Sequence, residues 1–375
     1  MRSDLSPDDR LLETFFELVR IDSPSGFEAA CAEYCARELA AVGCSLHYDD
    51  AAGRTGSDTG NLIAELKGTA PGVLVLSAHL DCVEPCRGVE PVVVDGIIVS
   101  AGDTVLGADD KAGLAAAIEC VRRLAAGDEP HPTVRCVFTV QEELGLVGAK
   151  ALDPAYAAGD LCLVLDAAGE PGGIVVAAPT HYTFAAEFLG RAAHAGVAPE
   201  LGVSAITMAA EAIASMSLGR LDEVSTANVG SIHGGAATNV VTARVDVTGE
   251  CRSLDRERVE RLRLAMDDAM HSAAEKYGGV VNVAWTLEYE GFNRDESDPL
   301  VETVAAAVRA IGREPVTFRT GGGSDANVFA TAGVPTLALA CGMSGVHGTD
   351  EQLAVEDLVA LTELCTSVAH GMARG

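Results

Sequence analysis

The chain has 375 residues, more than one hydrophobic core usually holds, so two domains are expected. Its 26 basic and 55 acidic residues give a net charge of −29, which argues against nucleic acid and membrane partners because both attract positive surface. A hydrophobic content of 48% with 40 glycines is typical of a globular α/β protein and excludes a largely disordered chain.

The cysteines and the N-terminus indicate the cellular compartment. Eleven cysteines, an odd number, are scattered along the chain, and the first ten residues, MRSDLSPDDR, lack the apolar stretch of a secretory signal. No run approaches the roughly 18 apolar residues that span a bilayer. Reduced thiols in a cytoplasmic protein are therefore expected. Cys82 and Cys86 suggest a thiolate metal site, but no second pair with zinc-site spacing follows, and packing is the favoured interpretation.

Strand and helix signals alternate along the first half of the chain. Ser6 followed by Pro7 predicts the start of a helix that continues through 11–21. Strands are then expected at 61–66, 72–81, 133–140 and 160–167, and helices at 109–127 and 146–157. The strands are nearly continuous apolar runs, as expected where helices cover both faces of a sheet.

The middle of the chain has a different order of elements. Strands are expected at 181–190, 226–234, 240–253 and 280–290, with helices at 202–216 and 255–278. This β-α-β-β-α-β order is the ferredoxin-like pattern. The α/β pattern then resumes with helices at 299–312 and 324–333, strands at 315–320 and 334–340, and a final helix. We therefore predict one domain formed by 1–179 and 292–375, with a second domain inserted at 180–291.

Acidic and histidine side chains gather where the predicted strands end and a helix begins. They are His79, Asp81, Asp109, Asp110, Glu142, Glu143, Asp166 and His347. In open α/β sheets, ligands bind outside the carboxyl ends of the strands, so these side chains should meet at one edge. A single acid at such a place is usually a helix cap or a solvated turn, but this many acids with two histidines are hard to explain as caps.

The chemistry of this set favours two metal ions. Imidazole and carboxylate groups without paired thiolates suit zinc, manganese or cobalt. The ligands are too many for one tetrahedral ion but enough for two ions that share a carboxylate, hold a hydroxide and polarise a carbonyl. Strand alternation predicts that Glu142 and Glu143 point to opposite faces. We expect the chain to turn after them, so that one binds metal and the other accepts a proton.

In this order the motifs His-x-Asp, Asp-Asp-Lys, Glu-Glu, Asp, Gly-Gly-Ser-Asp and His resemble the dinuclear zinc exopeptidases that include peptidase T, carboxypeptidase G and acetylornithine deacetylase. The segments GADDKAG, QEELGLVGAKALD and GGSDANVF are most similar to the peptidase T branch. The resemblance covers nearly the whole chain. It implies an α/β catalytic domain with a mixed sheet and helices on both faces, and an inserted ferredoxin-like α+β domain that serves as lid and dimerisation surface.

The resemblance also implies roles for individual residues. It assigns five ligands to two divalent ions: His79 and Asp166 to one, Glu143 and His347 to the other, and Asp109 between them. Asp110 is the rival for the bridging position. Glu142 would be the general base and then the acid for the leaving amine, and Asp81 would orient the His79 ring.

Three residues of the inserted segment would bind substrate. His194 in GRAAHAGVAPELG would reach the active site of a partner subunit and support the carbonyl oxyanion, which implies a homodimer through the inserted domain. Asn239 in ATNVV would lie near the substrate, and Arg252 in GECRSL would anchor a substrate carboxylate. The structural alternatives are a loop histidine, a turn residue and a surface ion pair, respectively.

The expected function is that of a metal-dependent exopeptidase, an aminopeptidase acting on short peptides such as tripeptides. The alternative within the family is an N-acyl-amino-acid deacylase or a carboxypeptidase. Zinc is the expected metal, although the same ligands accept cobalt or manganese. A non-catalytic metal-binding protein is disfavoured because every expected ligand and the base are present.

Overall fold

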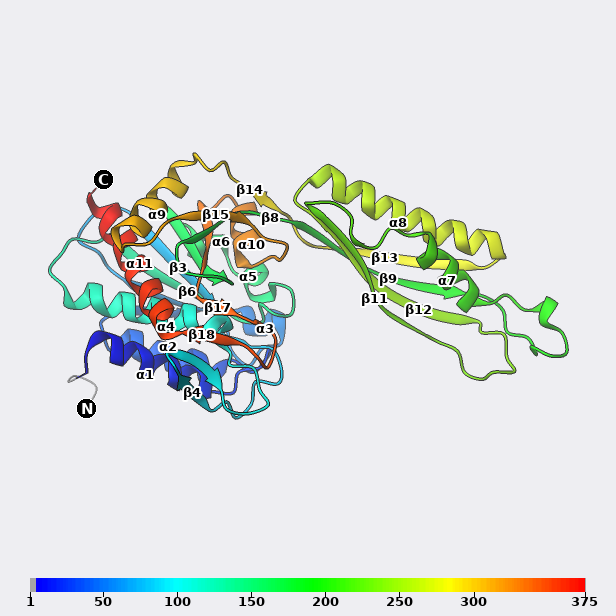
Figure 1. Cartoon of the computed structure of the whole chain (residues 1–375), viewed down its shortest axis with the longest axis horizontal. Helices are drawn as coiled ribbons and strands as arrows, with labels where there is room; N and C mark the ends of the chain where they lie inside the picture. Colours follow the sequence, from blue (N-terminus) through cyan, green and yellow to red (C-terminus); the bar gives the residue numbers. More distant parts are fainter. Residues whose placement is uncertain (1–4, 375) are drawn as a thin grey trace. The chain divides into compact units, whose positions relative to one another are not determined.

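The computed structural model describes residues 5–374. The described chain divides into two compact units, of which the first comprises 5–176, 294–319 and 324–374, and the second comprises 177–293 and 320–323 (Figure 1). The second unit starts slightly before, and ends slightly after, the inserted segment expected at 180–291, and it also takes in the short loop 320–323.

The first unit is built on a mixed sheet. In spatial order the strands of this sheet are β1 (Ser45–Tyr48), β2 (Leu62–Leu66), β6 (Thr133–Thr139), β3 (Val73–His79), β7 (Leu161–Ala167), β16 (Thr336–Ala340), β8 (Gly173–Ala178) and β14 (Phe292–Asn293), with β15 (Val316–Arg319) also paired to β8. The last two residues of β8 and all of β14 fall within the residue range of the second unit. The central strands β6, β3, β7 and β16 are parallel, whereas β2 and β8 join them antiparallel. The predicted α/β fold with a mixed sheet is confirmed.

The parallel centre brings several strand ends to one edge. His79, the last residue of β3, pairs in register with Thr139, the last residue of β6. On the other side of β3, Ser77 pairs with Val164 of β7, two residues before Asp166. The side chains that follow these three strands therefore lie close together, as the general rule for open α/β sheets predicts.

Helices lie on both faces of this sheet (Figure 1). On one face α4 (Ala108–Ala126) packs against β3 and β7. Three further helices pack against α4, namely α1 (Pro7–Arg20), α2 (Ala29–Ala40) and α11 (Val355–Arg374). Helix α9 (Pro299–Ala310) packs against α11. On the other face α10 (Asp325–Thr331) packs against β7 and β16, next to α5 (Val147–Ala151), which contacts α3 (Ala51–Thr55). Because α4 is covered on nearly all sides, most of its side chains are buried.

Local sequence signals account for the helix ends, with one correction. The Ser6 hydroxyl accepts a hydrogen bond from the Asp9 amide at 3.2 Å, and Pro7 is the first residue of α1, as predicted. The single helix predicted at 146–157 is wrong. Two short helices replace it, α5 and α6 (Pro154–Ala157), because Pro154 has no amide hydrogen to continue a helix and instead begins a new one.

A small second sheet was not anticipated from the sequence. It consists of β17 (Met343–Ser344), β18 (Gln352–Ala354), β5 (Ile97–Ser100) and β4 (Pro91–Val94), all antiparallel. Strands β17 and β18 form a hairpin, and its loop contains His347. These strands are too short to produce a recognisable alternating pattern, which explains why the sequence did not predict them.

The second unit has its own sheet and core. Its elements are β9 (Thr180–Leu189), α7 (Ala205–Ser215), β10 (Gly219–Arg220), β11 (Ser225–Gly234), β12 (Arg244–Ser253), α8 (Arg256–Tyr277) and β13 (Val280–Tyr289). The antiparallel sheet runs β10-β11-β12-β9-β13, and both helices pack on it around buried Phe188, Met208 and Met270. Apart from the short β10, this is the β-α-β-β-α-β order of the ferredoxin-like pattern. No helix among residues 5–374 is long and apolar enough to cross a membrane.

Candidate metal centre

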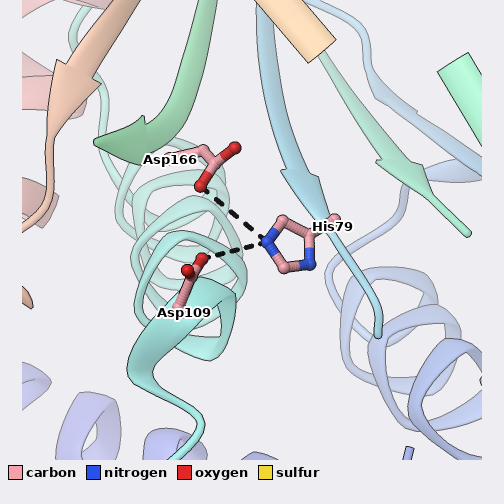
Figure 2. A group of neighbouring side chains, drawn as sticks. All are labelled: His79, Asp109 and Asp166. Carbon is pink, nitrogen blue, oxygen red and sulfur yellow. Dashed lines mark hydrogen bonds and ion pairs between the residues drawn. The ribbon is translucent and has the colours of Figure 1, made fainter. Parts of the chain in front are cut away.

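The first group of candidate ligands surrounds the ring of His79 at the end of β3. Nε2 of His79 lies 3.0 Å from Oδ1 of Asp109 and 3.8 Å from Oδ1 of Asp166 (Figure 2). Asp109 stands at the beginning of α4, and Asp166 is the sixth residue of β7. The other ring nitrogen, Nδ1, lies 3.1 Å from the Asp81 carbonyl oxygen, so the main chain fixes the ring with Nε2 toward the two carboxylates.

A second group forms on the other side of Asp109. Nε2 of His347 lies 3.3 Å from Oδ2 of Asp109 and 3.0 Å from Oε1 of Glu143. Asp109 thus turns one carboxylate oxygen to His79 and the other to His347. That is the geometry expected of a carboxylate shared between two cations. All of these residues belong to the first unit.

Asp110, the rival for the shared position, faces elsewhere. Its Oδ2 accepts a hydrogen bond from the His79 amide at 3.2 Å, and its Oδ1 accepts one from the Gly113 amide at 3.1 Å. The peptide bond that joins it to Asp109 is cis. With its carboxylate on backbone amides, Asp110 supports the main chain of β3 and α4, and Asp109 alone of the two joins the ligand groups.

Glu142 and Glu143 reach the same site because the chain turns one residue before them. Gln141 has a left-handed backbone conformation, with φ of +51°. The amides of Glu142 and Glu143 then both donate to the Asp81 carboxylate, at 3.0 and 3.2 Å, and Ser25 donates to it at 2.6 Å. Asp81 therefore fixes both the loop after β6 and, through its carbonyl oxygen, the ring of His79.

Burial and crowding shift the pKa values of these groups. Burial, with the charges of Asp325, Glu143 and Asp109, raises the pKa of the Glu142 carboxyl well above its usual value. Burial lowers the pKa of His79, but its contacts with Asp109 and Asp81 outweigh that effect and raise the pKa well above normal. So many buried carboxylates repel one another, and a bound cation would cancel that repulsion.

The donors present fit two divalent metal ions. Their ligand atoms form three groups, each within 4.8 Å: His79, Asp109 and Asp166; His79, Glu142 and Glu143; and Asp109, Glu143 and His347. Oε1 of Glu143 is buried and has no hydrogen-bond donor at a favourable angle, although His347 is close to it. No cysteine belongs to these groups within the described chain, and Cys82 and Cys86 pack with Val105 instead.

Several supporting residues escaped the sequence reasoning. Glu28 is buried and accepts hydrogen bonds from the amides of Gly26 and Gln141, at 2.7 and 3.1 Å. Asp325 accepts a hydrogen bond from Thr139 at 2.5 Å, and burial raises its pKa to about 6. Asp325 belongs to the Gly-Gly-Ser-Asp motif, so a signal for it existed, whereas nothing in its neighbourhood distinguishes Glu28 from a surface acid.

The substrate-binding residues expected in the inserted segment occur at two places in the second unit. His194 and Asn239 are exposed neighbours, since His194 forms a bridge with Val240 and the Ala195 amide donates to the Asn239 carbonyl oxygen. Arg252 lies near the opposite end of β12. Its guanidinium donates to both oxygens of Glu250, at 3.2 and 2.8 Å, and to the Tyr289 hydroxyl at 3.2 Å. Roughly 25 Å of strand separates the two places.

Comparison with known proteins finds peptidases that match most of the chain. A profile described as Peptidase family M20/M25/M40 matches residues 75–370. The crystal structure of aminopeptidase PepT from Bacillus cereus ATCC 10987 is 43% identical, with 98% of this chain and 99% of that chain covered and a TM-score of 0.91. A tripeptidase structure from Staphylococcus aureus subsp. aureus Mu50 is 37% identical over the same shares, with a TM-score of 0.94. Peptidase T of Clostridium perfringens strain ATCC 13124 is 25% identical over 96% of this chain and 89% of its own length.

Proposed function

The chain belongs to peptidase family M20/M25/M40, and on that premise we propose that it is a metal-dependent aminopeptidase that hydrolyses short peptides, including tripeptides. The observation that carries the proposal is the position of Asp109, which turns its two oxygens to His79 and His347. The similarity to structures described as an aminopeptidase and a tripeptidase supports the substrate class.

We assign the predicted ligands accordingly. His79 and Asp166 would hold one ion, and Glu143 and His347 would hold the other. Asp109 would bind to both ions. Zinc is the first choice, and cobalt or manganese suit the same donors. When bound, the ions would act as Lewis acids on the scissile carbonyl and on the attacking water.

The remaining chemistry belongs to side chains of the protein. Glu142 would take a proton from the attacking water and return it to the leaving amine. Asp81 would keep the His79 ring and the two glutamates in place through the hydrogen bonds described above.

His194 would contact the substrate from a second copy of the chain, and its neighbour Asn239 would lie near the same substrate. Their separation from Arg252 along β12 supports this assignment, because the two ends of one second unit are too far apart to hold one short peptide. We therefore propose a homodimer formed through the second unit. The eleven free cysteines, ten of them buried, agree with a cytoplasmic location.

The alternative function, a carboxypeptidase or an N-acyl-amino-acid deacylase, would depend on firm binding of a substrate carboxylate by Arg252. The Glu250 carboxylate already pairs with this guanidinium, so an added carboxylate would gain less from it than from an unpaired arginine.

Replacement of Glu142 by Gln tests the mechanism. E142Q should lower kcat by about 10²- to 10⁴-fold, because the amide cannot accept the proton, while metal content measured by elemental analysis stays at the wild-type level. The exposed Glu363 on α11 provides the matched control, E363Q, which should keep full turnover. Unchanged kcat in E142Q would contradict the assigned base.

A panel of free tripeptides, N-acetyl amino acids and peptides blocked at the amino end tests the substrate class. The expected result is cleavage of free tripeptides with release of the first residue. Cleavage restricted to acylated compounds would favour the deacylase. Chelation of the metals should abolish either activity, and readdition of Zn²⁺ or Co²⁺ should restore it.

A further inference from the structure

Glu351 is a buried acid next to the candidate metal centre, and neither the sequence motifs nor the mechanism gives it a role. Its side chain is 2% exposed. Oε2 accepts a hydrogen bond from the Gly107 amide at 2.7 Å, and Oε1 accepts one from the Asp109 amide at 2.9 Å. The carboxylate therefore uses both oxygens to hold the segment that carries Asp109.

Within this segment, no N-cap side chain accepts a hydrogen bond from the backbone amides at the start of α4. Gly107 precedes α4 with a left-handed backbone, φ +74°, and it has no side chain to cap the helix. Asp109 and Asp110 are not helical in their backbone angles. Free amides at the start of a helix need an acceptor, and Glu351 supplies it from a distant part of the chain.

Glu351 also belongs to the hairpin loop that presents His347. The loop joins β17 to β18, and within it the Gly348 amide donates to the Gly345 carbonyl and the Glu351 amide donates to the Gly348 carbonyl, at 3.0 and 3.1 Å. His347 has a left-handed backbone, φ +66°, and lies inside the first of these two turns. Glu351 thus ends the turn that directly follows the turn holding His347, while its side chain accepts hydrogen bonds from the backbone amides of Gly107 and Asp109.

We propose that Glu351 is a positioning residue that fixes Asp109 relative to His347, and so sets the affinity of the metal ion held between them. The inference rests on the metal ligands proposed above. Partners of this kind, one step removed from a metal, typically change metal affinity by about 10- to 100-fold when they are replaced. A residue that served only as a helix cap would change the stability of the protein without changing metal affinity.

The test is a titration of metal-free protein with Co²⁺, in which binding is measured by calorimetry and by the visible absorption of bound Co²⁺. In E351Q the amide oxygen can accept only one of the two hydrogen bonds, and its NH₂ group faces the other amide. We expect two Co²⁺ ions to bind to wild type and the weaker affinity to fall by about 10- to 100-fold in E351Q. The control E363Q makes the same chemical change on exposed α11 and should titrate as wild type.

A double variant separates positioning from general damage. If Glu351 acts through His347, E351Q should cost far less Co²⁺ affinity in an H347A background than in wild type. Equal losses in both backgrounds, or Co²⁺ affinity within threefold of wild type in folded E351Q, would overturn the inference. If E351Q does not fold, E351D is measured in its place, since it keeps both acceptors but shortens their reach. Failure of wild type to bind Co²⁺ would instead contradict the proposed metal centre.

Discussion

Gln141 shows how a single backbone conformation directs two adjacent acids into one site. In a regular strand, neighbouring side chains point to opposite faces. The left-handed conformation of Gln141 ends the strand geometry, and both following amides then meet the Asp81 carboxylate. The alternation rule is obeyed up to Thr139 and no longer applies where the two glutamates begin.

Substitutions at Gln141 test this conformational requirement. Asn tolerates the left-handed region and Val does not, because its branched side chain clashes with the backbone there. Q141V should lower the free energy of unfolding by about 1–3 kcal/mol, and Q141N by clearly less. Urea denaturation of both variants measures the difference. Equal stability of the two would show that the left-handed conformation imposes no such requirement.

At the scale of elements, a buried ion cluster attaches α4 to α1. The Glu119 side chain on α4 is fully buried and accepts a hydrogen bond from Nε of Arg10 on α1 at 2.9 Å. Arg122, one turn further along α4, lies 3.4 Å from the same carboxylate. Since α4 also begins with the segment that contains Asp109, this contact joins α1 to the helix that carries a candidate metal ligand.

Removal of the Glu119 side chain should lower the stability of the protein. E119A leaves Arg10, whose side chain is 25% exposed, without this partner, and the expected loss of unfolding free energy is about 1–3 kcal/mol. The same truncation at exposed Glu363 should change stability by less than about 0.5 kcal/mol. Thermal and chemical unfolding measure both. A loss in E119A as small as that in the control would mean that solvent compensates the unpaired arginine.

Strand β12 provides a pH-dependent contact. Glu250 and Arg252 lie on the same side of the strand, and the contact of Glu250 with His181, followed by that with Arg252, lowers the Glu250 pKa to about 2 from its ordinary 4.5. A lowered folded-state pKa stabilises the protein fully above pH 4.5 and progressively less as the pH falls toward 2. Relative to wild type, E250Q should therefore lower the free energy of unfolding by up to about 2 kcal/mol at neutral pH. The difference between the two proteins should be smaller at about pH 3. Urea unfolding of E250Q at several pH values, with E257Q as the exposed control, tests whether the loss of stability decreases as the pH falls.

At the scale of the whole molecule, the proposed division of labour places the metals in the first unit and some substrate contacts in the second unit of a partner. This arrangement predicts complementation between two inactive proteins. E142Q lacks the base and H194A lacks the contact supplied in trans, so each homodimer should be inactive. A heterodimer of the two should contain one intact site, because the H194A chain keeps Glu142 and receives His194 from its partner.

Coexpression of the two variants with different tags tests the prediction. An equal mixture should recover about a quarter of wild-type turnover, since half of the dimers are mixed and each mixed dimer has one working site. Recovery in the purified heterodimer supports His194 in trans. No recovery would show that His194 serves its own chain or that the dimer is not the active form.

Much of the fold could be predicted because its signals are long and regular. The apolar runs at β3, β6 and β7, the helix at α4 and the acids at their ends follow from periodicity and from the geometry of parallel sheets. The sequence also supplied the candidates His79, Asp109 and Asp166, which the structure brings within one group. Their roles as metal ligands stay a prediction.

Other features of the fold and of the site depend on contacts between residues far apart in the sequence, or on backbone conformations that the residue type does not predict. Gln has no special preference for the left-handed conformation, so the turn at Gln141 could not be assigned to that residue. Glu351 follows Asp350 in a polar turn and looks like a solvated acid, although it is buried against Gly107 and Asp109. Pro154 could have divided the helix predicted at 146–157, since proline breaks a helix from within.

The second unit leaves and re-enters the first through adjacent strands. Ala177 on β8 pairs in register with Asn293 on β14, so the two ends of the inserted segment lie side by side. A gene could therefore lose, exchange or lengthen the stretch between these codons without disturbing the central sheet. On the proposed assignments, a change of this segment would alter substrate contacts and dimer assembly, while the candidate metal ligands, all in the first unit, would stay in place.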